Sequence, residues 1–334
     1  MKKLGVIILS LFATACCVID DDLSVCDVDF VINYALELRA DITTQLETEL
    51  NEEADSTARK AIAQWLQPIF TDHVKDVDLR FFLSQTDELA YLIKEEVNDN
   101  KTSYTIQLPK ENYMHLGVAN IVDNRQVQLS GEEHSGTMWV KTNNGDKLPS
   151  MNTGVFSARL PMEVHDSISQ SFTVHLYMVN AAVALVLDPS DCADIVSING
   201  LMAGAADGFA VCDSAYAYNR DYYVIMDRVE EKQPQKAPQR TPTQIMETKP
   251  RLCLGAVALP TRNGKKWYLT TTSVLTDDRR TTTTLTFYEP LKAGELKIVK
   301  CKIGEGGEVK PADSDVGVAI ELDWKQGGDH NIDL

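Results

Sequence analysis

The sequence predicts a mainly β protein of two tandem antiparallel β-sandwich domains, with one amphipathic helix inserted in the first. From residue 74 onward, short apolar or alternating runs are separated by clusters of Asn, Asp, Gly and Pro, a spacing typical of β-sandwiches. The chain has 334 residues, whereas a single core usually stops growing near about 250 to 300 residues. Because similar amounts of expected strand lie on either side of Leu160, we expect domains at 28–160 and 161–334.

The first sandwich is expected to begin with a strand and a helix. Residues 28–38 alternate between apolar and polar side chains, which indicates a half-buried strand of an antiparallel sheet. Over 41–67 the apolar residues recur about every four positions, and Pro68 marks the end of the pattern. This stretch is expected to form an amphipathic helix that lies as a lid on the sheet.

Two stretches bear on the second half of the chain. The tract 171–187 is the longest strand-like run, and it predicts either one long strand or two strands bent near Asn180. Residues 230–250 contain four prolines and lack apolar periodicity. We therefore expect them to form a mobile loop inside the second sandwich.

The first 15 residues have the parts of an export signal: a positive start, a short apolar run and a small-residue segment. A cysteine follows directly, which resembles a bacterial lipoprotein signal. Cleavage before Cys16 would place Ala13 and Ala15 at the positions that require small residues, so Cys16 is favoured over Cys17 as the lipidated residue. An ordinary secretory signal is the alternative, because the apolar run is too short to span a bilayer as an anchor of about 20 residues.

Charge narrows the classes of partner. The chain has 49 acidic and 32 basic residues and a formal net charge of −17, which disfavours nucleic acid and anionic lipid surfaces. The acidic stretch 16–27 is interpreted as a solvated tether, and its Asp20–Asp22 run as part of that tether rather than a cation site. No later segment is apolar enough to cross a membrane, so membrane attachment is expected through Cys16.

Motifs for catalysis or metal binding do not stand out, and we predict no enzyme, cofactor or metal. The six histidines have no metal-ligand spacing, and no nucleophile elbow, Walker loop or calcium loop is found. Residues Gly304–Gly307 are predicted to form a hairpin turn rather than a phosphate cradle. Cys192 and Cys212 would close a short disulfide loop, but most cysteines are expected to be buried free thiols.

The N-terminal motif and the strand order resemble the fimbrillin-A-associated anchor lipoproteins of bacteroidal fimbriae, also called type V pili. The most specific part is the lipoprotein cysteine followed by Asp21–Cys26 and, at once, by the alternating strand from Val28. Asn112 stands where the family usually has Gly, and Asp27 where it usually has Pro. Further segments with family-like features are 76–82, 108–113, 172–187 and 318–334.

The resemblance implies a lipoprotein of the outer membrane, with two transthyretin-like β-sandwiches, that holds a fimbria to the cell and limits its length. The implied partners are the membrane, through the lipid (palmitate) on Cys16, and a fimbrial subunit. That subunit is expected to be joined by strand addition, in which an extended segment completes an open sheet through main-chain hydrogen bonds.

A second function stays open from the residues alone. A surface lipoprotein could bind glycan or another ligand through exposed aromatic side chains such as Trp139, Trp267 and Trp324. Each of these tryptophans is more readily explained as a core or near-core residue, as large aromatics on strands usually are. A hydrolase is the least supported class, because no pair of carboxylates is singled out.

Overall fold

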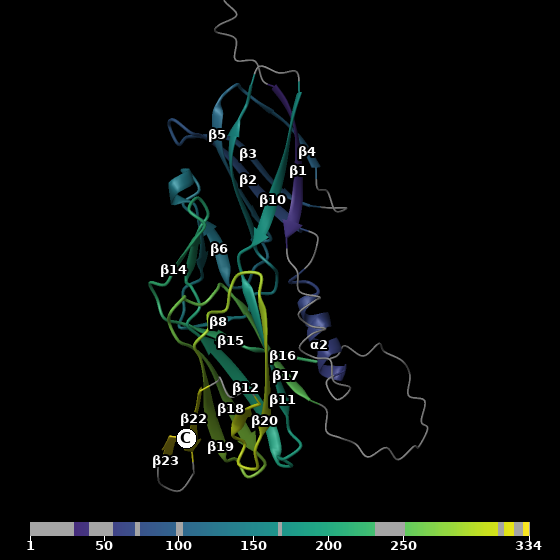
Figure 1. Ribbon diagram of the computed structural model, residues 1–334, viewed down its shortest axis with the longest axis vertical. Coiled ribbons are helices and arrows are strands. Elements are labelled where there is room, and N and C mark those ends of the chain that lie inside the picture. The colour runs from purple at the N-terminus through teal and green to yellow at the C-terminus, as the bar shows by residue number, and fades with distance from the viewer. Residues whose placement is uncertain are drawn as a thin grey trace, which may run out of the picture.

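The protein consists of four β-sheets and one α-helix in the part of the chain that the structure describes, which confirms the mainly β prediction (Figure 1). The computed structural model describes residues 30–39, 56–70, 74–97, 103–165, 169–230, 251–312, 317–323 and 330–333. The signal 1–15, the tether 16–27, residues 231–250 of the loop expected at 230–250, and Trp324 lie outside these residues.

The upper sandwich in Figure 1 is one seven-stranded sheet folded onto itself, with the strand order β3-β2-β5-β9-β10-β1-β4. Strands β9 and β10 pair at only two positions, Tyr177 with Ser157 and Met178 with Phe156, so the sheet bends there and its two halves enclose a core. Its strands are β1 (Phe30–Arg39), β2 (Asp76–Leu83), β3 (Leu89–Glu96), β4 (Ser103–Leu108), β5 (Asn112–Ala119), β9 (Phe156–Glu163) and β10 (Ser169–Met178).

The lower sandwich packs two sheets face to face, with the orders β16-β17-β11-β20-β21 and β23-β22-β19-β18-β12-β15-β8. Trp267 is buried between them, with its ring stacked on Phe287 at a centroid distance of 4.2 Å. The strands are β8 (Lys147–Pro149), β11 (Ala181–Asp188), β12 (Ile195–Ala203), β15 (Tyr223–Ile225), β16 (Asp227–Val229), β17 (Leu252–Ala258), β18 (Trp267–Leu275), β19 (Arg280–Phe287), β20 (Leu296–Ile303), β21 (Val309–Pro311), β22 (Gly317–Asp323) and β23 (His330–Asp333).

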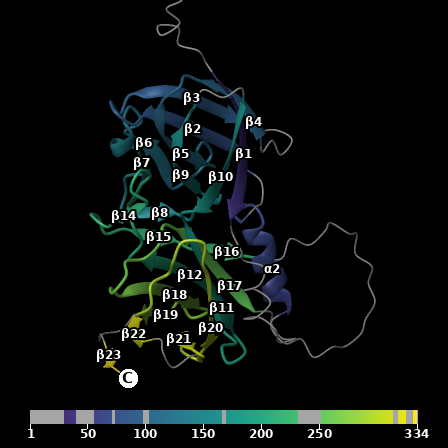
Figure 2. The ribbon, with the colours of Figure 1, turned by 45° about the horizontal axis from the view of Figure 1, so that its top comes forward.

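A small sheet lies beside the junction of the two sandwiches and draws strands from both halves of the sequence (Figure 2). Its order is β14-β13-β7-β6, and a short 3-10 helix, η3 (Ser135–Thr137), precedes β7. The loop before η3 is held on β2 by Arg80, which donates to the carbonyl of Glu132 at 2.9 Å. The strands are β6 (Val127–Ser130), β7 (Trp139–Thr142), β13 (Gly208–Ala210) and β14 (Ala215–Ala217).

Helix α2 (Ser56–Leu66) covers the lower sandwich, although it follows β1 in the sequence. Both views show it alongside β16 and β17 (Figures 1 and 2). Its buried residues Ala58, Ala61, Ile62 and Leu66 share a core with the sheet of β11 and β17. The predicted lid and its end before Pro68 are confirmed, whereas the assignment to the first sandwich needs correction; residues 41–55 of the expected helix are not described. Amphipathicity shows which face is buried but not against which sheet.

The tract 169–188 is two strands, which resolves the alternative left by its sequence. Strand β10 ends at Met178 and β11 begins at Ala181, in the other sandwich. Asn180 holds the bend, because its side-chain oxygen accepts the N–H of Val155 at 2.7 Å and its carbonyl accepts the N–H of Gly294 at 2.9 Å. The chain therefore passes from β10 of the upper sandwich to β11 of the lower sandwich at residues 179–180.

The domain boundary expected at 160/161 falls inside β9, and residues 169–178 pair with β1 and β9 in the upper sheet. We keep a division into two sandwiches as a proposal and move its crossing point to residues 179–180. Counting strands does not locate the boundary, because β7 and β8 precede residue 160 in the sequence but pair with β13 and β15, which follow it.

Strand β3 was not expected from the sequence. It is an edge strand with mostly exposed residues on both faces, so apolar and charged side chains follow each other without the alternation that burial of one face imposes. The predicted turn at Gly304–Gly307 is confirmed: it joins β20 to β21, and Gly307 adopts a φ of 83°.

Candidate functional site

Strand β12 has an open edge, and this edge is the strongest candidate for a binding site. Strand β18 pairs with β12 from Ile195 to Ala203, but β15 pairs only with Leu201–Ala203. After β15 the chain turns at Met226 and crosses to the other sheet, where β16 pairs with β17. This change of sheet leaves the first half of β12 without a strand neighbour on that side within the described chain.

The backbone hydrogen bonds show which groups point to the open edge. The N–H of Met226 donates to the carbonyl of Gly200 at 2.9 Å, on the side of β15. Because the N–H and C=O groups of alternate residues in a strand point to the same edge, those of Ile198 also point there. A β-bulge between Ile195 and Ser197 bends the strand just before this position.

A groove of about 220 Å³ runs along this edge, between β12 and the β16–β17 pair of the opposite sheet. Val196 lies at its rim and is 61% exposed. Ile195 and Leu252 line it and are only partly buried, although they pack against the core of the lower sandwich. The groove is therefore a place where that core reaches the surface.

An extended peptide fits the chemistry of this groove better than a small polar ligand does. A strand continuing the line of β15 would hydrogen-bond to the backbone of Ile198 and insert alternate side chains between the two sheets. Natural proteins usually protect an exposed edge with charged residues, proline or a β-bulge, and of these Val196-Ser197-Ile198 has only the bulge between Ile195 and Ser197. The edge is thus suited to accept a partner strand.

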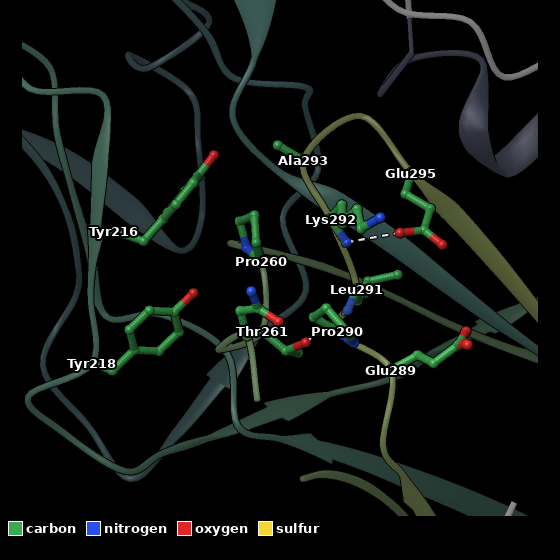
Figure 3. Close-up of a pocket in the computed structure, with 11 residues that line it drawn as sticks. Tyr216, Tyr218, Pro260, Thr261, Glu289, Pro290, Leu291, Lys292, Ala293 and Glu295 are labelled. Atoms are coloured by element: carbon green, nitrogen blue, oxygen red, sulfur yellow. Dashed lines mark hydrogen bonds between the residues drawn. The ribbon is translucent and has the colours of Figure 1, made fainter. Parts of the chain in front are cut away.

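A second hollow, of about 580 Å³, lies where the small sheet meets the loops of the lower sandwich. Figure 3 shows Tyr216 and Tyr218 on one wall and the loop from Glu289 to Glu295 on the other. Two of its polar groups already have partners: the Tyr216 hydroxyl donates to the carbonyl of Val179 at 3.0 Å, and the Glu295 carboxylate accepts the N–H of Lys292 at 2.8 Å. These contacts explain the shape of the hollow but do not select a ligand.

The residues singled out in the sequence are not gathered at one site. Cys16 lies outside the described residues, so its lipidation stays a prediction. Trp267 is fully buried and donates its indole N–H to the carbonyl of Glu289 at 2.7 Å, so it belongs to the core. Trp139 is partly buried on β7.

The described cysteines and the buried histidine lie apart from any candidate site. Cys192 and Cys212 do not form the possible disulfide with each other, and Cys253 and Cys301 are buried thiols. His115 is buried against Phe81. In the described residues no cluster of His, Cys, Asp or Glu is arranged to hold a metal ion, and no helix there is long and apolar enough to cross a bilayer.

Solved structures with the same fold come from Bacteroides. A candidate adhesin of Bacteroides thetaiotaomicron is 10% identical to this chain, and the match covers 90% of this chain and 98% of that one with a TM-score of 0.52. A candidate polysaccharide-binding protein of the same species is 9% identical over 91% of this chain and 98% of that one, with a TM-score of 0.51. This chain therefore has the β-sandwich architecture of these Bacteroides proteins.

A more distant likeness is to the fimbrial anchor protein Mfa2 from Porphyromonas gingivalis. It is 12% identical over 89% of this chain and 98% of that one, with a TM-score of 0.47. No protein-family model and no curated protein sequence matches the chain.

Proposed function

We propose that this chain is a structural lipoprotein that attaches a fimbria to the bacterial outer membrane, limits the length of that fimbria and catalyses no reaction. Two features support this proposal, one for attachment to the membrane and one for binding the partner. The sequence 1–27 has a lipoprotein-type signal, Cys16 and an acidic tether, which would hold the chain at the membrane. The described fold offers an open sheet edge, which would hold the partner.

The open edge of β12 is the observation that carries the proposal. Its partner is a fimbrial subunit that donates an extended segment with apolar residues at alternate positions. Such a segment would complete the sheet beside β15 and cover the partly buried Ile195 and Leu252. Pairing through the main chain resists pulling because several hydrogen bonds lie side by side along the strand.

The membrane side of the proposal is tested by Cys16→Ala. Burial of acyl chains contributes about 0.8 kcal/mol per CH2, and more than one chain is needed for stable anchoring. The variant is therefore expected to move from the membrane fraction to the soluble fraction, and cells carrying it are expected to shed fimbriae into the medium. Retention of the variant in the membrane would contradict lipid attachment through Cys16.

The partner side is tested by Val196→Lys, which places a charge at the rim of the groove. Lysine at a strand edge opposes pairing with another strand, so fimbriae should be shed although the variant stays in the membrane. Val122→Lys is the matched control, because Val122 is 60% exposed and lies far from β12 in the sequence, after β5. Normal fimbriae in the Val196→Lys strain, or equal shedding in both strains, would refute the assignment to β12.

A further inference from the structure

The outer face of the larger lower sheet has an unusual row of side chains. Ala203 on β12 is paired with Tyr223 on β15 and with Tyr268 on β18. Directly paired residues share one face of a sheet, so both tyrosines stand on the outer face with only a methyl group between them. They are 44% and 37% exposed, respectively. Two strand spacings separate them, which is about 10 Å.

The part of this face formed by β12, β15 and β18 carries no charge, in a protein whose net charge is −17. The outward residues of β12, β15 and β18 are all uncharged. Charged residues share this face on the strands around that centre: Lys147 on β8 is paired with Tyr223, Arg280 begins β19, and Glu321 and Asp323 on β22 are paired with Thr282 and Arg280. An uncharged partner lying along β15, β12 and β18 would not have to remove water from a charged group on these three strands.

Threonine hydroxyl groups line the part of the face formed by β18 and β19. Thr270 and Thr284 lie opposite each other with their hydroxyl oxygens 3.2 Å apart, and Thr272 and Thr282 form the next pair at 3.3 Å. Each threonine is partly exposed. Because a hydroxyl has one donor and two acceptor positions, each pair keeps hydrogen-bonding capacity for a ligand.

We propose that this outer face, centred on Tyr223 and Tyr268, binds an uncharged polysaccharide chain. Sugar rings have apolar C–H faces that pack on aromatic rings, and their hydroxyl groups match the donors and acceptors of the threonine pairs. The two tyrosines would contact separate sugar units of one extended chain. This function lies beyond fimbrial attachment and does not depend on it, because the groove at β12 opens on the edge of the sheet and not on this face.

A second copy of the chain is a poorer occupant of this surface. Stable interfaces between identical chains are usually more apolar than the remaining surface, whereas threonine side chains make up much of this face. The proposal therefore commits to a polysaccharide, and self-association is one of the outcomes that the experiment distinguishes.

The experiment measures retention of the purified full chain on insoluble uncharged polysaccharides (cellulose, xylan, mannan and β-1,3-glucan) and on polygalacturonate as a charged polymer. We expect retention on at least one uncharged polymer and a loss of about tenfold or more in affinity for Tyr223→Ala/Tyr268→Ala. Tyr177→Ala is the matched control, since Tyr177 is 59% exposed on a strand of the upper sandwich. The control should bind like the unaltered chain.

Four results would overturn the proposal: no retention on any uncharged polymer, retention on polygalacturonate alone, equal binding by the double variant, or equal loss in Tyr177→Ala. Sedimentation velocity adds a fifth, a dimer of the unaltered chain that the double variant abolishes, which would assign the face to a second copy. Far-ultraviolet circular dichroism of each variant should match the unaltered chain, because both tyrosines project from the sheet surface.

Discussion

Replacing Gly255 with alanine tests how α2 is held on the lower sandwich. Gly255 lies in β17, beneath the indole ring of Trp65. A Cβ atom at this position would lie 2.4, 2.6 and 2.7 Å from three carbons of that ring, whereas carbon atoms in contact are usually about 3.5 to 4.0 Å apart. The rigid ring would have to move by about 1 Å or more, and the carboxylate of Asp227, which accepts a hydrogen bond from Trp65, opposes that movement.

Two opposing terms set the expected size of the effect. Overpacking of this kind costs about 1 to 3 kcal/mol, while alanine is better than glycine inside a strand by roughly 0.5 to 1 kcal/mol. Gly255→Ala should therefore lower the free energy of unfolding by about 1 to 2 kcal/mol. In a chain that already carries Trp65→Ala the clash is absent, so the same change should raise stability by roughly 0.5 to 1 kcal/mol.

The assay is urea unfolding of the four members of this double-mutant cycle, followed by circular dichroism. The change of sign between the two backgrounds is the decisive result, because it isolates the contact between the helix and the sheet. Gly136→Ala is the control, since no atom lies within 4 Å of the position its Cβ would take, and its effect should stay within about 0.5 kcal/mol. An equal cost of Gly255→Ala with and without Trp65 would refute the reasoning.

Two further predictions concern the buried polar groups of β2 and β5. Arg80 is buried and donates two hydrogen bonds to the buried carboxylate of Asp78, at 2.6 and 2.9 Å, so Arg80→Ala should lower the free energy of unfolding by about 3 to 5 kcal/mol. Urea unfolding should show a smaller decrease for the double variant Asp78→Leu/Arg80→Met, because no buried charge of this pair is then left unpaired. Equal decreases in the two variants would contradict this account. Burial lowers the pKa of His115 from 6.5 to about 4, against the opposing effect of its hydrogen bond with the carbonyl of Arg80. His115 is therefore protonated near pH 6.5 in the unfolded chain but only near pH 4 in the folded chain. Folding stability of about 3 kcal/mol that is present above pH 6.5 should be lost as the pH falls to 4. For His115→Gln the free energy of unfolding should change less between these two pH values. An unchanged dependence of that free energy on pH would show that other groups cause the loss of stability.

Much of the local structure was predictable because local physics decides it. Alternation of apolar residues predicted β2, β4 and several strands of the lower sandwich. In β4 the period of two follows from burial of one face, whereas the polar residues Asp76, Asp78 and Arg80 of β2 are buried as well. The end of α2 before Pro68 was predictable because proline lacks the backbone donor that a helix interior needs. The run of Ala181–Asp188 was strand-like for a further reason: it is buried on both faces, so apolar residues follow one another without interruption.

The candidate sites were not predictable to the same degree. Ile195–Ile198 was expected to be a strand, but the sequence does not show that β15 leaves its edge open after Leu201. Tyr223 and Tyr268 are 45 positions apart, and only the two pairings with Ala203 bring them onto one row. No spacing rule could have linked them, because strand register is set by contacts between distant segments.

The sequence by itself determined the class of the fold and the face that each regular strand or helix buries, and it predicts the lipoprotein-type start at Cys16. Tertiary structure alone decided which strands became neighbours, which sheet α2 covers, and where a strand edge stays open. The physical reason is that periodicity reports whether a side chain is buried, whereas main-chain pairing joins any two strands of suitable length. The choice among those pairings is made by packing of the whole core.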